Sequence, residues 1–530
     1  MARNLYRFYL YVVYIGMLSF AATGIGRLLQ LVFTFTPLKG ASTGPTSSDI
    51  VQAIVFAIVS LVIAVPLCAL HYWLIRRDIR SDPAAGSGGV RSFFLNFAEA
   101  ISLLSGVFTA SFVISSLGQP YPIDVTGSAA YTIVSLGFFA LLEWERRRSQ
   151  AAPGAAIVFQ RIHFYGAQLI LLIGLTVSWF STVSQMLDTL LSTSPASFTC
   201  GPTSTSSCSP NLLLFIVSTL WIMLFWVGYG WLSRGDAYSL LRQVLHFISF
   251  AYGVGLALTG VNLVLVLALQ TLFKVSVLPT YSPSALYSFV APLTFGVVVV
   301  AFYSFWLSTS AMRSQAQRTT SFFIGEVIAT AFLAISFWFG CGFLLFNIIE
   351  HIAPLSALDL SNLVIALASI IPGTAYIPLS LYLSRRSMSA TVAGPRRTLV
   401  FSLLVGGILV SVGSAITLLY MLLTSLLGAT LFDGWQHVAH GAGAGLIVGL
   451  LIAGIYFWTA RRERLLGAQK TSPATEAEVL TPKPSAEAIE TAPATSTTLS
   501  IEDVLDALQA GKITRDEAAA RIRGIVGAVR

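Results

Sequence analysis

The sequence predicts an all-α membrane protein, a polytopic bundle of about twelve transmembrane helices with a small cytoplasmic helical hairpin. Composition is the first reason. Of the 530 residues, 55% are hydrophobic and only 10% are charged, and the mean hydropathy is +0.78. Soluble domains are about 25% charged, so a soluble fold is excluded. The 35 Phe, 18 Tyr and 10 Trp residues exclude a disordered chain.

The second reason is a series of long apolar stretches. A helix that crosses a bilayer needs about 20 apolar residues, and twelve stretches meet this length. The first stretch is too long for a signal peptide, and no clear small-residue cleavage site follows it. The predicted spans are approximately 5–35, 50–75, 92–117, 122–142, 161–191, 210–232, 240–273, 284–309, 321–349, 360–383, 397–428 and 433–459.

The third reason is the distribution of basic residues, which also predicts the orientation. The N-terminus and the loops after the even-numbered spans hold 21 basic residues, whereas the opposite loops hold only Lys39 and Lys274. The positive-inside rule therefore places both termini in the cytoplasm of a bacterium, with the chain in its inner membrane. This distribution suits anionic lipid headgroups, so the bilayer is the expected partner and no nucleic acid is expected.

Two cysteines lie in a polar loop on the predicted external side. Cys200 and Cys208 are close enough in sequence to pair in an oxidising exterior, and we consider them a candidate disulfide. The alternative is two free thiols, because sequence spacing does not establish the geometry of a disulfide. Cys68 and Cys341 lie inside spans and are interpreted as small apolar packing residues.

The even-numbered spans share an ending, an aromatic residue followed within three positions by arginine. Such pairs place an aromatic ring at the headgroup level and a guanidinium near the phosphates. Their regular recurrence predicts that residues 1–464 form six tandem two-helix units, related as parallel repeats. The clearest pairs are Trp73 with Arg76, Trp231 with Arg234, Tyr382 with Arg385, and Trp458 with Arg461.

One of these endings carries a resemblance. The segment VPLCALHYWLIRR, which contains Pro66, His71, Trp73 and Arg76, resembles a bacterial family of multi-pass membrane proteins catalogued only as a domain of unknown function. The resemblance could extend over most of residues 1–464. It implies a membrane location and no known activity.

Two glutamates inside predicted spans are the candidate site for an ion, a proton or a substrate. Glu99 lies eight residues after Arg91, and Glu326 lies eight residues after Arg318, so the two acids could occupy equivalent depths. A buried ionisable group in a span is costly, which makes a functional role the first hypothesis. The alternative is that each glutamate pairs with an arginine or reaches the headgroups near the inner interface.

Other polar residues are weaker candidates. Arg27 and Asp188 lie near the outer ends of two long spans and form a candidate ion pair. His351, His437 and His440 are weak candidates for a metal site, since a site needs three or four converging ligands. The alternative is that these histidines are interfacial residues. The sequence carries no nucleotide, haem or metal fingerprint of useful specificity, and no cofactor is predicted.

The C-terminal region differs from the rest of the chain. Residues 465–499 are rich in Ala, Thr, Pro, Ser and Glu and predict a flexible linker. Residues 500–530 predict a helical hairpin with capping-box-like starts, and they resemble short C-terminal hairpins attached to many bacterial membrane proteins. So few residues cannot bury a stable core alone. The hairpin is therefore expected to self-associate or bind a protein partner; a weakly folded amphipathic tail is the alternative.

Two classes of function fit these patterns. The first is a non-catalytic membrane protein with a scaffold, sensor or assembly role through its tail. The alternative is a secondary transporter or channel for a small solute or ion that uses Glu99 and Glu326. An enzyme is not expected, because the sequence contains no catalytic motif with a specific spacing.

The orientation is testable with reporter fusions. We expect green fluorescent protein fused after Arg530 to fluoresce, because this reporter folds in the cytoplasm. Alkaline phosphatase, which is active only outside, should be active when inserted between Cys200 and Cys208. The opposite pattern of the two activities would overturn the predicted topology.

Overall fold

A computed structural model gives the fold. It describes residues 2–40, 42, 44–86, 88–119, 123–148, 155–191, 198–199, 207–208, 211–233, 239–275, 283–309, 315–352, 360–386, 390–427, 434–470 and 517. Its internal contacts divide the chain into Met1–Glu463 and Arg464–Arg530. Most of the second unit, including the predicted hairpin at 500–530 apart from Glu517, lies outside the described residues.

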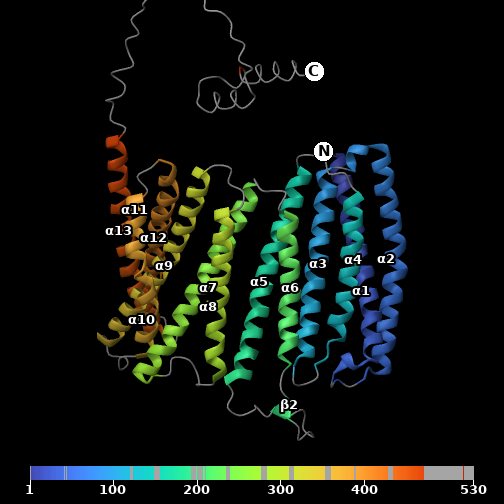
Figure 1. The fold of residues 1–530 in the computed structure, drawn as a ribbon, viewed down its shortest axis with the longest axis horizontal. Helices are drawn as coiled ribbons and strands as arrows, with labels where there is room; N and C mark the ends of the chain where they lie inside the picture. The colour runs from blue at the N-terminus through green and yellow to red at the C-terminus, as the bar shows by residue number, and fades with distance from the viewer. Residues whose placement is uncertain are drawn as a thin grey trace, which may run out of the picture. The chain divides into compact units, whose positions relative to one another are not determined.

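The first unit is a bundle of long helices, which confirms the predicted fold class (Figure 1). Eleven segments among the described residues are long and apolar enough to cross a membrane, and α8 contributes a shorter apolar segment, Phe289–Phe305. The helices are α1 (Ala2–Phe33), α2 (Ser47–Ser81), α3 (Gly89–Leu117), α4 (Thr126–Arg148), α5 (Ala155–Leu191), α6 (Leu212–Leu232), α7 (Leu240–Phe273), α8 (Pro283–Thr309), α9 (Gln315–Ile352), α10 (Leu360–Gly373), α11 (Tyr376–Arg386), α12 (Ala390–Leu426) and α13 (Trp435–Lys470).

The outer surface of the bundle is apolar. Many large hydrophobic side chains are exposed along the helices, among them Val62, Leu224 and Leu409. Exposure of so much apolar surface is unfavourable in water and is expected where lipid chains surround the protein. The chain is therefore a multi-pass membrane protein.

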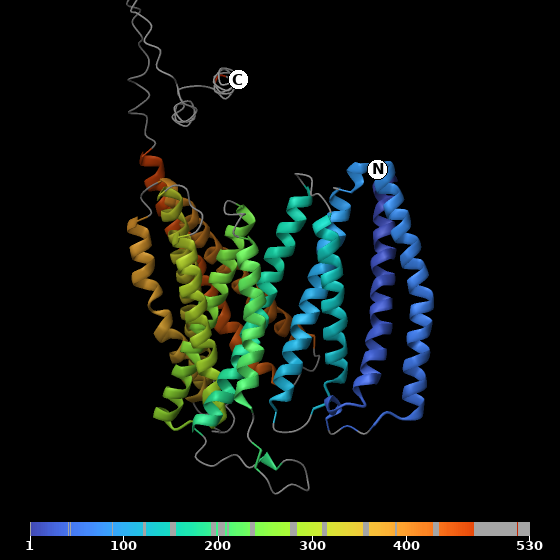
Figure 2. The same cartoon turned by 45° about the vertical axis from the view of Figure 1, so that its right-hand side comes forward.

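Consecutive helices pack as antiparallel pairs, which places the chain reversals at two opposite ends (Figures 1 and 2). The most extensive contacts of α1, α3, α7 and α9 are with α2, α4, α8 and α10 respectively. One end carries Arg76, Arg77 and Arg80 of α2, and Arg146 and Arg147 of α4. We call this end the basic end; α1 also begins there.

Helix ends and breaks follow local chemistry. At the end opposite the basic end, Thr46 and Asp49 form a capping box that starts α2. Pro66 lies inside α2 without ending the helix. By contrast, the span that contains Pro372 is broken into α10 and α11, and the Thr374 N–H donates to the Ile370 carbonyl at 2.8 Å across the break. The helix is thus interrupted at Thr374 and Ala375, directly after Gly373.

Glycines allow two helix pairs to approach closely. A Cβ atom at Gly260 of α7 would lie 2.4 Å from the backbone nitrogen of Leu293 in α8, and one at Gly296 would lie 2.3 Å from that of Ala257. In α13, a Cβ at Gly449 would meet Ser411 of α12 at 2.5 Å. Small residues at these crossings let the helix backbones approach closely. The resulting van der Waals packing contributes to helix association in lipid.

The largest buried apolar cluster lies in the middle of the bundle, where α3, α5, α6, α7 and α8 meet. Leu171 and Leu172 of α5 are fully buried, and Tyr303 of α8 is almost fully buried. Because this cluster joins five helices, it fixes the relative positions of the polar side chains that the same helices carry near the basic end.

Two short strands connect α5 to α6. The strands β1 (Phe198–Thr199) and β2 (Ser207–Cys208) are antiparallel, with Phe198 opposite Cys208. Cys200 and the side chain of Cys208 lie outside the described residues, so the candidate disulfide stays a prediction. The last helix, α13, continues to Lys470, so its final residues lie within 465–499, the range that the sequence predicts as a flexible linker.

The glycine contacts between α7 and α8 generate a stability prediction. Gly260→Ala should lower the free energy of unfolding by about 1–3 kcal/mol, because the added methyl group meets the backbone of α8. Gly137→Ala in α4 is the matched control, since a Cβ there has open space. The measurement is thermal or denaturant unfolding in detergent; equal effects of the two substitutions would contradict the proposed close packing.

Candidate functional site

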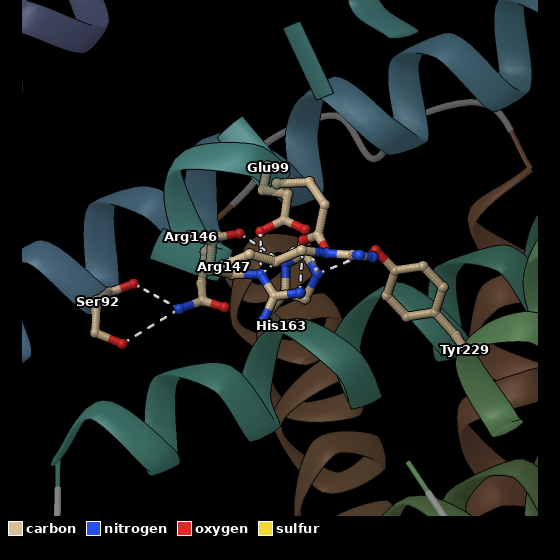
Figure 3. A network of polar contacts seen from close by, with 8 residues as sticks. Ser92, Glu99, Arg146, Arg147, His163 and Tyr229 are labelled. Atoms are coloured by element: carbon tan, nitrogen blue, oxygen red, sulfur yellow. Dashed lines mark hydrogen bonds and ion pairs between the residues drawn. The ribbon is translucent and has the colours of Figure 1, made fainter. Parts of the chain in front are cut away.

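Polar side chains from four neighbouring helices meet near the basic end (Figure 3). Glu99 comes from α3, Glu143 and Arg146 come from α4, His163 comes from α5, and Tyr229 comes from α6. We call these five residues the Glu99 site. Glu99 is 1% exposed and His163 is 4% exposed, so the site lies inside the bundle.

The depth of the site follows from the positions of its residues in their helices. Glu99 lies ten residues after Gly89, the first residue of α3, which corresponds to about 15 Å along the helix axis. Arg146 lies in the last turn of α4, from which its long side chain reaches back to Glu99. The guanidinium of Arg146 thus lies deeper in the bundle than the backbone of this residue. It pairs with the carboxyl group of Glu99, whose neighbours in the sequence are mostly apolar.

Arg146 bridges two carboxyl groups. Its Nε lies 2.9 Å from Glu99 Oε2, and its Nη2 lies 2.5 Å from Glu143 Oε2. Arg147 also contacts Glu143, with 2.6 Å between Nε and Oε1. The Arg147 side chain is 75% exposed, whereas that of Arg146 is 20% exposed. The two neighbouring arginines therefore differ sharply in environment although the sequence presents them as one basic run.

The two carboxyl groups lie around one guanidinium. Glu99 Oε2 lies 2.9 Å and Glu143 Oε2 lies 2.5 Å from nitrogen atoms of Arg146. Two carboxylates held around one cation in a buried site repel each other, which favours a proton on one of them.

His163 lies next to the carboxyl pair. Its Nδ1 is 2.7 Å from the backbone carbonyl oxygen of Asn96, and its Nε2 is 3.0 Å from the Tyr229 hydroxyl. Because a carbonyl only accepts, Nδ1 donates, and in neutral histidine Nε2 accepts the hydroxyl proton of Tyr229. Nε2 is also 3.9 Å from Glu99 Oε1. A proton on Nε2 would therefore face a carboxyl oxygen.

A second group of polar side chains joins α2, α3 and α4 at the basic end. Arg91 of α3 lies 2.5 Å from Glu145 of α4, and Arg76 of α2 lies 3.2 Å from the same carboxyl group. Glu145 therefore ties three helices together and supports α3 and α4 next to the Glu99 site. Arg91 also donates to the carbonyl oxygen of Gly86 at 3.0 Å.

Arg7 ties α1 to the end of α2. It contacts Asp78 and Asp82 at 2.7 Å each. The hydrogen bond from Arg7 holds the pKa of Asp82 below its usual range. Because a lowered carboxyl pKa stabilises the fold only above the pKa of the unfolded chain, this contribution is lost as the pH falls through the lowered value.

The two glutamates that the sequence singled out lie in different parts of the bundle. Glu99 is in α3, which packs against α1, α4, α5 and α6, whereas Glu326 is in α9, which packs against α7, α8, α10, α11 and α12. Glu326 is half-buried, and its carbonyl oxygen accepts a hydrogen bond from Thr330 at 2.7 Å. A shared role for the pair stays a prediction, and the structure brings them to no common site.

The remaining predicted residues have separate surroundings. Arg27 donates to Gln30 on its own helix at 3.3 Å, and the side chain of Asp188 lies outside the described residues. The Arg27–Asp188 ion pair stays a prediction.

One of the three histidines near the opposite end of the bundle lies next to an acidic residue. His437 of α13 lies 2.5 Å from Glu350 of α9, so these two helices meet. His351 is exposed and His440 is half-buried. No group of three or more His, Cys, Asp or Glu residues able to hold a metal occurs within the part of the chain that is described.

Sequence reasoning identified Glu99 but not its partners. Glu143 and Arg146 belong to the charged segment EWERRR at the end of a predicted span, and His163 lies near the start of the next span. One signal was present: Glu143 and Arg146 lie three residues apart and share a helix face. No pattern along the chain places that face against α3.

The two arginines at the end of α4 generate a matched test of charge compensation. Arg146→Gln should lower the free energy of unfolding by about 3 kcal/mol, because it leaves buried carboxyl groups without their cation. Arg147→Gln should cost less than about 1 kcal/mol, because its side chain is exposed. Urea unfolding in mixed micelles measures both. Adding Glu99→Gln to Arg146→Gln should recover part of the loss; no recovery would argue against their pairing.

Comparison with known proteins identifies one match. The family model described as Domain of unknown function (DUF5671) matches residues 7–121, which run from α1 to just beyond α3 and include Glu99. No curated protein and no solved structure matches the chain. The match confirms the predicted resemblance to a family catalogued only as a domain of unknown function, over a shorter stretch than 1–464. The chain is therefore a multi-pass membrane protein with an N-terminal segment similar to that family.

Proposed function

We propose that this chain is a proton-coupled secondary transporter in which the Glu99 site takes up and releases the proton. The observation that carries the proposal is that two carboxyl groups, Glu99 and Glu143, share the guanidinium of Arg146 inside a helical bundle. The proposal follows the transport alternative drawn from the sequence for Glu99. It leaves Glu326 out of the proton site.

Proton loss at this site changes the force between two helices. With one proton present, only one of the two carboxyl groups, Glu99 of α3 and Glu143 of α4, is negatively charged, and Arg146 compensates it. Without it, two negative charges stand side by side in a medium that screens them weakly. Arg146 then faces two carboxylates. Protonation thus alters how tightly α3 packs against α4, which is the kind of link that couples an ion to a helix movement.

His163 and Tyr229 supply a path for the proton away from the carboxyl pair. Three polar groups follow one another across α3, α5 and α6, with 3.9 Å between Glu99 Oε1 and His163 Nε2 and 3.0 Å between Nε2 and the Tyr229 hydroxyl. Series of acidic and histidine side chains within spans serve as proton relays in pumps and transporters. The Asn96 carbonyl keeps the ring oriented along this series.

The proposal includes a location and an orientation. The basic residues at the ends of α2 and α4 favour a cytoplasmic basic end in a bacterial inner membrane, with both termini cytoplasmic. The Glu99 site then lies on the cytoplasmic side of the bilayer centre, where protons enter from the cytoplasm. The role involves no covalent chemistry and no cofactor.

A scaffold or assembly role through the tail stays a prediction from the sequence. Residues 500–530, except Glu517, lie outside the described residues. Proton coupling in residues 1–464 is compatible with a tail that binds a partner, because the two roles use different parts of the chain.

Infrared spectroscopy tests the proton site directly. We expect the wild-type protein to show the carbonyl stretch of a buried protonated carboxylic acid at neutral pH, and this band should disappear in Glu99→Gln. Asp49→Asn is the matched control, because Asp49 lies at the opposite end of the bundle in a capping box. A band that persists unchanged in Glu99→Gln would contradict the assignment.

Transport is tested in proteoliposomes that contain a pH-sensitive dye. Proton flux driven by a substrate gradient should fall at least tenfold in Glu99→Gln and stay unchanged in Asp49→Asn. Glu326→Gln distinguishes the proposal from the paired-glutamate prediction. Equal losses in Glu99→Gln and Glu326→Gln would support the paired prediction and overturn a single proton site.

A further inference from the structure

A cavity of about 480 Å³ lies between α5, α6, α7 and α8, close to the basic end. It is separate from the Glu99 site. Polar side chains of its wall are deeply buried, among them Arg242, which is 3% exposed, Gln168 and Ser233, which are each 6% exposed, and His246, which is 8% exposed. A cavity whose wall combines apolar surface with a few buried polar groups is typical of a ligand-binding site.

The charge of the wall favours an anion. The lining contains the guanidinium of Arg242, and none of the lining residues that the structure describes is acidic. Arg242 also has contacts within the protein, while its side chain forms part of the cavity wall. It lies in the first turn of α7, where the helix dipole adds to the attraction for negative charge.

Another part of the cavity wall is aromatic. Trp226 of α6 lies against Phe302 of α8 with 4.9 Å between ring centroids, and His246 lies 5.6 Å from the Tyr303 ring. Trp226 and Tyr303 are buried. This wall provides flat apolar surface next to the cationic one, which suits a ligand that has both a charged group and an apolar body.

The cavity reaches the outer surface between α6 and α8. Leu224 and Trp231 of α6 line it and are 63% and 67% exposed, and Phe302 of α8 is 37% exposed. On a membrane-spanning bundle these exposed apolar residues face lipid chains. A ligand in the cavity therefore has a route for its apolar part into the bilayer.

The geometry points to this cavity as a binding site for an anionic amphiphile, with its carboxylate or phosphate at Arg242 and its apolar part along Trp226 and Phe302. Gln168 offers an amide to the same head group. Gly230 leaves room for that amide, because a Cβ there would lie 3.1 Å from Gln168 Nε2. This inference does not depend on the proton site.

The two sites nevertheless share α5 and α6. Gln168 lies five residues after His163 on α5, and Gly230 follows Tyr229 directly on α6. Tyr229 bonds His163 in the Glu99 site, while Trp226 and Gly230 line the cavity. A shift of α6 caused by a ligand would therefore move the Tyr229 hydroxyl.

Ligand-dependent thermal unfolding of the full-length protein in dodecyl maltoside tests the site. Phosphatidylglycerol and dodecanoate are the anionic probes, and phosphatidylcholine is the zwitterionic control. We expect the anionic probes to raise the Tm of the wild type, and Arg242→Gln to weaken their apparent affinity about tenfold or more, since it removes a charged hydrogen-bonding group. Arg397→Gln, an exposed arginine of α12, should leave the affinity unchanged.

A second variant keeps the test decisive if Arg242→Gln folds poorly. Gly228→Leu adds an apolar side chain to the cavity wall, at a position where a Cβ meets no neighbour within 4 Å. It should lower the affinity for both anionic probes without changing the charge of the cavity. A Tm shift with phosphatidylglycerol only identifies a membrane lipid as the ligand, and a shift with dodecanoate only identifies a free amphiphile. Shifts that match phosphatidylcholine, or that both variants retain in full, would overturn the proposal.

Discussion

Compensation of charge inside an apolar bundle is the constraint on which the arrangement near the basic end depends. Lipid and packed side chains cannot solvate an ion, so each buried ionisable group needs a partner. Arg146 meets this need for Glu99 and Glu143 together, and Glu145 does the same for Arg76 and Arg91. These contacts connect α2, α3 and α4 in one register, because a shift by one helical turn would separate every pair.

Away from the basic end, the helices pack closely through glycines and apolar side chains. Gly260 and Gly296 bring α7 and α8 into backbone contact, and the apolar cluster around Leu171 joins them to α3, α5 and α6. Near the basic end, polar side chains replace this apolar packing. There α3, α4, α5 and α6 carry the Glu99 site, and α5, α6, α7 and α8 enclose the cavity. The proton site and the cavity thus depend on the same apolar centre.

The fold class and the spans were predictable because they depend on composition and on properties local in sequence. A helix that crosses lipid satisfies its own backbone hydrogen bonds, so its length and apolar character are sufficient to identify it. Glu99 was predictable in the same way, as a costly charge within a span. Its partners were not, because Glu143, Arg146 and His163 occur in polar segments that interfacial chemistry explains equally well.

The sequence by itself determined that this chain is a multi-pass helical membrane protein. The reason is that the favourable free energy of transferring apolar side chains out of water adds up along the chain. Only the tertiary structure decided which charges share a site. It separated Glu326 from Glu99, joined His437 to Glu350, and buried Arg146 while leaving its neighbour Arg147 exposed. The physical reason is that ion pairs depend on distances between helices, which are set by packing at glycines and in the apolar centre rather than by any local pattern.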